Sequence, residues 1–109
     1  MEDAGELQPQ ELSGQDALKL IRAWIKADSR CVKFRPHSKL RGKQRGITLR
    51  QMLTCLERGI VTEPPHINAQ GNWQFDISRA AAGEEITCGV AIGWQSKQVF
   101  VLTAFPRRG

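Results

Sequence analysis

The spacing of hydrophobic residues changes once, about halfway along the chain. In the first half apolar residues recur every three to four positions, the period of an amphipathic helix, and in the second half they alternate with polar residues, the period of a strand. The first pattern predicts helices over residues 14–27 and 36–45, and a third from its cap at Thr48 to Gly59. A short strand or extended segment is expected at residues 30–34.

Residues typical of helix ends mark these boundaries. Ser13 and Thr48 each stand three positions before an Asp or Gln that completes a capping pair. Pro36 suits a first helical turn because its missing N–H would have no partner there, and Gly46 suits the left-handed conformation that ends many helices. Gly42, inside the second helix, costs about 1 kcal/mol relative to alanine. This helix is therefore expected to depend on tertiary contacts.

The second half of the chain predicts a meander of strands. Residues 60–63 form a short strand closed by two prolines, and strands at 73–78, 86–94 and 99–105 follow, joined by links of hairpin length. The last of these is apolar at nearly every position, which predicts a central strand buried on both faces. The predicted fold class is therefore α+β, with an N-terminal helix and two further helices packed on one face of an antiparallel sheet of about four strands.

Length and composition fit a single domain. Residues 1–12 are polar and acidic and are expected to be a disordered leader, which leaves one α+β domain over residues 13–109. No apolar run approaches the roughly 18 residues of a membrane span, and the start lacks the pattern of a secretory signal, so we expect a cytoplasmic protein without membrane contact. The three widely spaced cysteines are expected to be buried or half-buried thiols, and no metal or other cofactor is expected.

Charge is distributed unevenly along the chain. The net charge is +5, but residues 1–12 hold four acidic and no basic side chains, so the other 97 residues carry 16 basic against 7 acidic, or +9. No Asp or Glu occurs between Ser29 and Leu56, a stretch with eight Lys or Arg residues. Positive charge of this density predicts contact with a polyanion, and RNA is the expected one. The alternative is a solvated surface, which usually mixes both signs.

Three residues of the second predicted helix form the main candidate site. His37, Arg41 and Arg45 follow at intervals of four, so they project from nearly the same side of the helix. Histidine can move a proton near neutral pH, and arginine binds phosphate oxygens through its planar guanidinium. RNA cleavage requires such groups: a base for the 2′-hydroxyl proton, cations for the phosphorane and an acid for the leaving 5′-oxygen. The alternative is that these residues only cap the helix and grip phosphate.

The order of short motifs in this region resembles a known pattern. His-x₃-Arg-x₃-Arg-Gly-Ile-Thr spans residues 37–48, Gly-Asn-Trp stands at 71–73 and Val-x-Val-x-Thr at 99–103. Over residues 33–106 the chain resembles a bacterial family of small domains without assigned function, related to RelE-like and MqsR-like toxin ribonucleases. The resemblance implies helices on a curled antiparallel sheet, RNA held against that sheet, and five residues near the functional surface: His37, Arg41, Arg45, Trp73 and Thr103. Tyrosine, which RelE-like ribonucleases often use near the scissile phosphate, is absent from this chain.

Further basic and polar residues extend the predicted RNA-binding surface. These are Lys33, Arg35, Lys39, Lys43, Arg50, Trp73, Gln74, Arg79 and Thr103. For Trp73 the alternative to stacking a base is burial, because it heads an alternating apolar strand. For His66, which follows two prolines, a surface position is weighed against a role as a second acid or base.

The leading hypothesis is an RNA-binding, toxin-like protein that acts as a metal-independent endoribonuclease of a toxin–antitoxin module. His37 is the expected acid or base, Arg41 and Arg45 are the expected phosphate clamps, and an acidic antitoxin protein is the expected partner. One alternative is a non-catalytic nucleic-acid-binding or regulatory module on the same fold, which would bind in a salt-sensitive way without giving a product. Another is a protein-interaction domain whose basic face docks an acidic partner.

Overall fold

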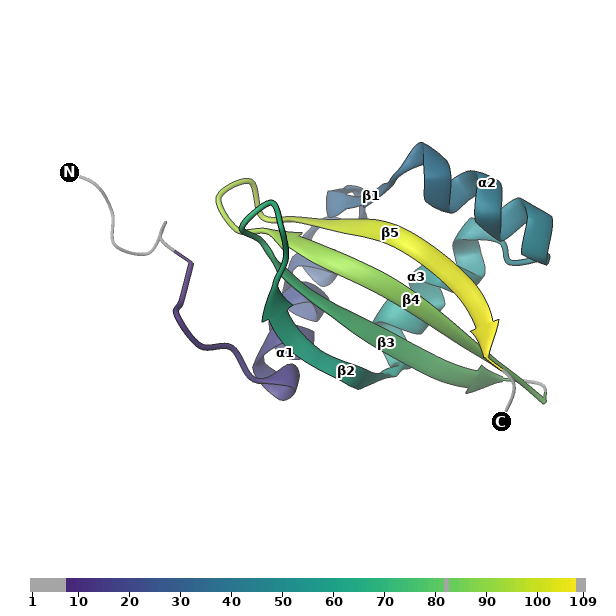
Figure 1. Ribbon diagram of the computed structural model, residues 1–109, viewed down its shortest axis with the longest axis horizontal. Helices are drawn as coiled ribbons and strands as arrows, with labels where there is room; N and C mark the ends of the chain where they lie inside the picture. Colours follow the sequence, from purple (N-terminus) through teal and green to yellow (C-terminus); the bar gives the residue numbers. More distant parts are fainter. Residues whose placement is uncertain (1–7, 82, 108–109) are drawn as a thin grey trace.

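The structure, a computed structural model, describes residues 8–81 and 83–107. Five strands in this part of the chain form one mixed sheet (Figure 1). Their order across the sheet is β1-β5-β4-β3-β2. The strands are β1 (Val32–Phe34), β2 (Ile60–Ile67), β3 (Trp73–Ala81), β4 (Glu84–Gly93) and β5 (Gln98–Arg107). Strands β2 to β5 form the predicted antiparallel meander, whereas β1 pairs with β5 in parallel.

The prediction of an antiparallel sheet of about four strands was therefore incomplete, because the sheet has a fifth strand and is mixed. The short segment predicted at residues 30–34 supplies that strand. Val32, Lys33 and Phe34 stand beside Val99, Phe100 and Val101 of β5. Pairing with β1 covers backbone N–H and C=O groups of β5 that an edge strand would leave open.

The α-helices end where the local signals indicated. They are α1 (Gly14–Ala27), α2 (Pro36–Arg45) and α3 (Leu49–Arg58), with a short 3₁₀ turn, η2 (Ser29–Cys31), after the first. Ser13 caps α1 through the backbone N–H of Asp16, Thr48 and Gln51 form a complete capping box on α3, and Gly46 ends α2 with φ of 75°. These boundaries confirm the helix predictions.

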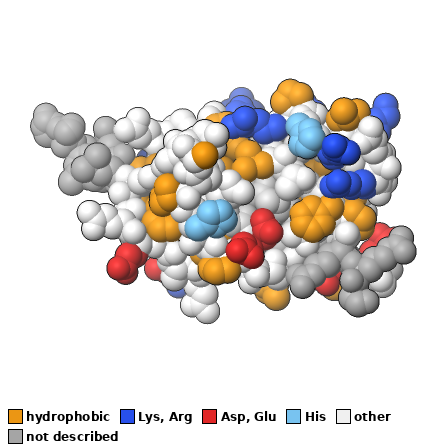
Figure 2. All heavy atoms as spheres, in the orientation of Figure 1, with side chains coloured by type: hydrophobic (Ala, Val, Ile, Leu, Met, Phe, Trp, Pro, Cys, Tyr) orange, Lys and Arg blue, Asp and Glu red, His pale blue; other side chains and the backbone are white. Residues whose placement is uncertain are grey.

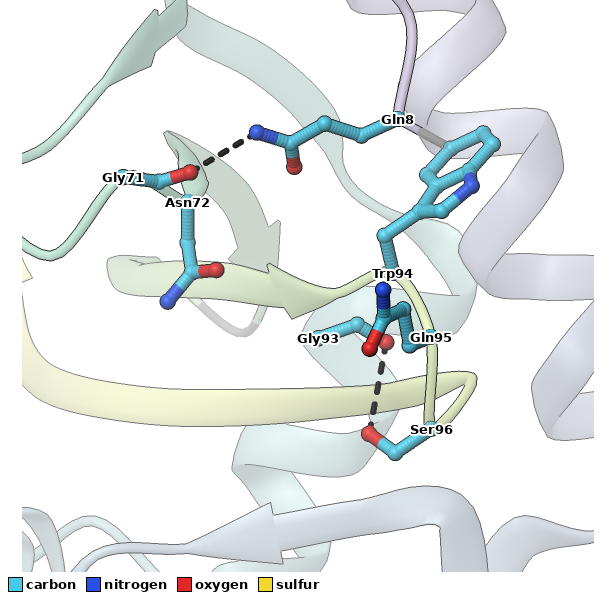
Figure 3. Close-up of a pocket in the computed structure, with 7 residues that line it drawn as sticks. All are labelled: Gln8, Gly71, Asn72, Gly93, Trp94, Gln95 and Ser96. Atoms are coloured by element: carbon cyan, nitrogen blue, oxygen red, sulfur yellow. Dashed lines mark hydrogen bonds between the residues drawn. The ribbon is translucent and has the colours of Figure 1, made fainter. Parts of the chain in front are cut away.

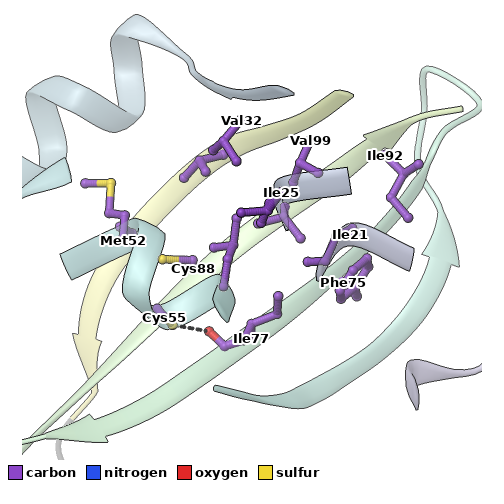
Figure 4. Close-up of a cluster of buried hydrophobic side chains, with 14 of the residues drawn as sticks. Ile21, Ile25, Val32, Met52, Cys55, Phe75, Ile77, Cys88, Ile92 and Val99 are labelled. Atoms are coloured by element: carbon purple, nitrogen blue, oxygen red, sulfur yellow. Dashed lines mark hydrogen bonds between the residues drawn. The ribbon is translucent and has the colours of Figure 1, made fainter. Parts of the chain in front are cut away.

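The core lies between one face of the sheet and the two helices α1 and α3, which lie behind the sheet in Figure 1. Both helices contribute buried stripes at helical spacing, and alternate residues of the strands meet them (Figure 4). Among the fully buried side chains are Ile21, Met52, Leu56, Phe75, Ile77, Val90 and Val99. Burial of each large apolar side chain contributes about 1.5–3 kcal/mol, so this layer is the main source of stability.

Helix α2 lies apart from this layer, against β5 at the edge of the sheet (Figure 1). The strand β5 lies inside the sheet between β1 and β4, as predicted, but the prediction that it is buried on both faces was wrong. Val99 and Val101 of β5 are fully buried, but Phe100 and Phe105 are only half-buried. Its apolar character reflects one face in the core and another partly covered by neighbouring side chains.

The segment before α1 contacts the sheet. Residues 1–7 of the expected leader lie outside the described residues, but Gln8 Nε2 donates a hydrogen bond to the Gly71 carbonyl at 2.7 Å. The Trp73 indole N–H donates to the Pro9 carbonyl at 3.1 Å, and Leu12 packs against the core. None of the helices in the described part of the chain combines the length and hydrophobicity needed to cross a bilayer.

Candidate nucleic-acid interface

The face of the sheet opposite α1 and α3, called the open face below, carries the candidate site. It is the face turned toward the viewer in Figures 1 and 2. Strand register places its side chains in rows that cross several strands. One row runs Glu63, Asp76, Gly89 and Thr103, and the next runs His66, Gln74, Ala91 and Phe100. The rows extend from β2 to β5, three strand spacings or about 14 Å.

Acidic residues and a histidine gather at the β2 end of these rows. Glu63 stands opposite Asp76, and His66 lies further along the same strand. Figure 2 shows acidic side chains beside a histidine on this part of the face. Burial, and then the Glu63 carboxylate, raise the pKa of Asp76 above its usual value, while His66 acts in the opposite direction. A carboxyl group with a raised pKa beside an imidazole can donate or accept a proton, which is what acid–base catalysis requires.

The middle of the open face has almost no side-chain bulk. Gly89 and Ala91 of the central strand β4 form its floor, and Thr103 of β5 lies beside it. A Cβ atom at Gly89 would stand 3.1 Å from Thr103 Cγ2 and 3.3 Å from Asp76 Oδ1. Glycine at this position therefore lets the Asp76 and Thr103 side chains approach each other over the backbone of β4.

Helix α2 borders the floor at the β5 end. Its buried stripe consists of Ser38 and Gly42, while His37, Arg41 and Arg45 are exposed along one side of that stripe. Figure 2 shows histidine, lysine and arginine side chains gathered over α2 and the neighbouring part of β5. The predicted grouping of these three residues on one side of an exposed helix is therefore confirmed.

Two arginines are anchored on β5 near this border. Arg45 Nη1 donates a hydrogen bond to the Ala104 carbonyl at 2.8 Å. The Arg35 guanidinium lies 5.4 Å from the centroid of the Phe100 ring, within cation–π distance. Both side chains are exposed, so each arginine is held by one contact and keeps other N–H groups for a ligand.

Other basic residues of the stretch between Ser29 and Leu56 face elsewhere. Lys39 and Lys43 line a groove of about 360 Å³ at the turn between α2 and α3, on the other side of the helix from Arg41. Arg50 and Arg79 line a cleft of about 300 Å³ on the α3 side of the sheet. The expectation of one continuous cationic surface was therefore wrong, because the helix periodicity and the strand alternation send these side chains to different sides.

Of the other residues predicted to contact RNA, some lie on the open face and some do not. Gln74 and Thr103 are half-buried on the open face. Lys33 is exposed on β1 beside the end of α1, away from the floor. Trp73 is only 6% exposed and its indole N–H is occupied by Pro9, so its side chain belongs to the core and leaves no ring face for a base. For Trp73 the alternative of burial is the correct one.

Glu63 and Asp76 were not predicted as site residues from the sequence, and His66 was given only a secondary role there. Asp76 was visible merely as a polar position in an alternating strand, and Glu63 as the end of a short strand. Their importance comes from cross-strand register, which a β-bulge between Val61 and Glu63 sets. The only local signal was the combination of an acid and a histidine three residues apart beside two prolines.

A separate hollow of about 460 Å³ lies where the β2–β3 and β4–β5 loops approach the segment before α1 (Figure 3). Gln8, Asn72, Trp94 and Ser96 are among its lining residues. None of the residues predicted as site residues lines it, and its charge is neutral. The hollow is therefore not part of the candidate interface.

Comparison of the chain with protein-family models, with curated proteins and with solved structures gave no match. Functional inference therefore depends on the geometry of the open face and on the sequence motifs.

Proposed function

We propose that the chain is a metal-independent endoribonuclease of the toxin type that holds single-stranded RNA across the open face of its sheet. One observation carries the proposal: the open face joins an acid–base group on β2 and β3 to the exposed arginines of α2 and of the residue before it, across a floor of glycine and alanine. The resemblance to RelE-like toxins also implies helices packed on a sheet that holds RNA. We thus propose that the chain shares both the fold type and the function of that family.

Phosphate binding is assigned to Arg35, Arg41 and Arg45. Their guanidinium groups are exposed along the border of the floor, and arginine binds phosphate oxygens in a bidentate way. Gly89 and Ala91 themselves are buried beneath neighbouring side chains, so RNA on this face would contact the side chains around the floor, among them Asp76 and Thr103. A single strand of RNA fits this surface better than a duplex. The arginines lie on only one side of a narrow face, and the acidic side chains on the opposite side repel further phosphates.

Proton transfer is assigned to two places on the same face. His37 keeps the role of acid or base expected from the sequence, because it is exposed on the α2 side. Asp76 with His66 supplies the second acid–base group, since the pKa of the Asp76 carboxyl is raised by burial and by Glu63. Cleavage through a 2′,3′-cyclic phosphate needs one base and one acid and no metal.

A cleavage assay on total RNA and on a labelled single-stranded oligonucleotide, in the presence of a chelator, tests the proposal. We expect cleavage by the unmodified chain and a loss of about 10²–10⁴-fold in rate for His37→Ala and for Asp76→Asn, with RNA binding nearly unchanged. Arg41→Ala should weaken binding. Lys39→Ala is the matched control, because it removes a similar charge from the opposite side of the same helix, and its rate should stay close to that of the unmodified chain.

Binding without any product would remove the enzymatic assignment and favour a non-catalytic nucleic-acid-binding module on the same fold. Absence of binding would remove both and leave a protein-interaction domain. An acidic antitoxin remains the proposed partner, since the arginine border of the open face is complementary to carboxylates as well as to phosphates. Inhibition of RNA cleavage by a co-expressed acidic protein that competes with RNA for the Arg41 side of α2 would support this.

A further inference from the structure

Two buried cysteines meet between α3 and the middle of the sheet, on the side away from the open face. Cys55 of α3 is 1% exposed and Cys88 of β4 is fully buried (Figure 4). Cys55 Sγ lies 3.3 Å from the Ile77 carbonyl and 3.5 Å from the Ile86 carbonyl. Since Cys88 is the cross-strand partner of Ile77, these contacts make Cys55 and Cys88 neighbours, and their side chains interact.

The two thiols differ in chemical character. A hydrogen bond from the Cys88 thiol lowers the pKa of Cys55, whereas burial acts in the opposite direction. The contact with Cys55 and burial raise the pKa of Cys88 far above its usual value. The Cys55 thiol, which donates to the Ile77 and Ile86 carbonyls, is thus the one of the two that loses its proton more readily.

Of the two cysteines, Cys55 is the one that lies at the base of a cleft. It lines the cleft of about 300 Å³ that Arg50 and Arg79 border. No hydrogen bond or ion pair of either guanidinium to another described residue is present, and the charge of Arg79 also lowers the pKa of Cys55. Positive groups beside a thiol at the base of a cleft favour its thiolate and attract an oxidant or its anion.

We propose that Cys55 and Cys88 form a peroxide-sensitive thiol pair, in which Cys55 is oxidised through the Arg50–Arg79 cleft and Cys88 then closes an internal disulfide between α3 and β4. In the first step the Cys55 thiolate attacks one oxygen of hydrogen peroxide, the O–O bond breaks, and sulfenic acid and hydroxide form. In the second step the Cys88 sulfur attacks the sulfenic sulfur, the S–O bond breaks, and water leaves with the Cys88 proton. Two electrons pass from the thiols to the peroxide, and a thiol reductant reverses the change.

Mass spectrometry of the full chain after treatment with hydrogen peroxide tests this inference. The Cys31→Ser variant is the reference chain, because Cys31 is half-buried and could otherwise link two molecules. We expect the intact mass to fall by about 2 Da, a tryptic digest to contain the Cys55 peptide joined to the Cys88 peptide, and dithiothreitol to restore the original mass. Arg79→Gln should slow the loss of free thiol several-fold, while Lys39→Gln, a charge change in the other groove, should leave the rate unchanged.

Substitution of Cys88 separates the two steps. In the Cys31→Ser chain, Cys88→Ala should stop at the sulfenic acid of Cys55, a gain of about 16 Da that dimedone traps. Circular dichroism before treatment establishes whether the Cys88→Ala variant is folded. If that variant does not fold, the Cys31→Ser chain, which keeps both cysteines, still tests formation of the disulfide. Peroxide that leaves both thiols free under conditions that oxidise Cys31 in the unmodified chain would overturn the proposal. So would oxygen addition to Cys55 without formation of the Cys55–Cys88 link in the folded Cys31→Ser protein.

Discussion

At the scale of single residues, the open face depends on Asp76. Its half-buried carboxyl group lies over the backbone of Gly89 and opposite Glu63, which is exposed, so two acidic side chains stand next to each other across the strands. Like charges directly opposite across two strands destabilise a sheet. Burial of the Asp76 carboxyl group and then the charge of Glu63 both have a cost for folding, and both raise the pKa of Asp76.

The pH dependence of stability should reveal this cost. Because the pKa of Asp76 is raised in the folded chain, the folded state holds the proton more tightly than the unfolded state. The group thus contributes stability below its ordinary pKa of 3.8, and this contribution is lost as the pH rises through the raised value. We expect Asp76→Asn to raise the free energy of unfolding at pH 7 by roughly 0.2–1 kcal/mol, and the difference to vanish near pH 3.

Urea unfolding from pH 3 to pH 8 measures this effect. Asp16→Asn is the matched control, because Asp16 stands in the first turn of α1, where a negative charge stabilises the helix. That substitution should lower stability at pH 7 by about 0.3–1 kcal/mol. An Asp76→Asn variant that is less stable than the unmodified chain at pH 7 would contradict the account of the acidic pair.

Gly42 is a second residue whose role is set by its surroundings. A Cβ atom there would meet the terminal methyl of Met52 and would lie 2.9 Å from the Ile47 carbonyl oxygen, which belongs to the backbone. Glycine lowers the helix propensity of α2 at this position, but it allows the close packing of α2 against Met52 and Ile47, which offsets that loss.

We therefore expect Gly42→Ala to destabilise the chain by about 1–3 kcal/mol, because overpacking outweighs the gain in helix propensity. Gly46→Asn serves as the comparison: Gly46 has φ of 75° and open space around it, and asparagine tolerates that conformation. Thermal unfolding should show a much smaller loss for Gly46→Asn. Equal losses for both variants would contradict the packing account of Gly42.

At the scale of elements, local sequence predicted the helix ends and the existence of strands β2 to β5, but not the pairing of β1 or the full length of β2. Caps and apolar stripes are encoded within a few residues, so the ends of α1, α2 and α3 could be predicted from the sequence. The parallel pairing of β1 with β5 joins segments more than sixty residues apart and leaves no local period in three residues. The extension of β2 through both prolines to Ile67 was missed for a related reason: β2 is an edge strand, where proline is tolerated.

The capping box of α3 offers a test at this scale. Thr48 Oγ1 accepts from the Gln51 N–H at 3.0 Å, and Gln51 Oε1 accepts from the Thr48 N–H at 2.8 Å. Thr48→Ala should lower the free energy of unfolding by about 0.5–2 kcal/mol, whereas Thr48→Ser, which keeps the hydroxyl, should change it little. Chemical denaturation checks both, and an unchanged midpoint for Thr48→Ala would show that packing alone defines the start of α3.

At the scale of the whole molecule, the positive charge is divided among several surfaces. Three arginines border the open face, two lysines flank the groove beside α3, and Arg50 and Arg79 line the cleft on the far side. A strand of RNA on the open face would thus contact only part of the basic residues that the sequence concentrates between Ser29 and Leu56. The high net charge then speeds encounter at long range more than it strengthens the bound complex.

This division predicts a modest salt dependence of RNA binding. Three phosphate contacts on a single strand give a slope of about −2 for log K against log salt concentration. Arg41→Ala should reduce the slope by about 0.7, and Lys39→Ala should leave it unchanged. Fluorescence anisotropy of a labelled oligonucleotide at several salt concentrations measures the slope, and a value near −5 would mean that RNA wraps around several faces.

The sequence by itself determined the fold class, the helix boundaries and the exposed position of His37 with Arg41 and Arg45, because capping, periodicity and helix geometry act within one or two turns. Only the tertiary structure decided which side chains share a surface. Cross-strand register brought Glu63, Asp76 and Gly89 together, and the packing of α2 on β5 turned its arginines and its lysines to opposite sides. Contacts of this kind depend on how distant elements pair and pack, and a local pattern of residues does not contain that information.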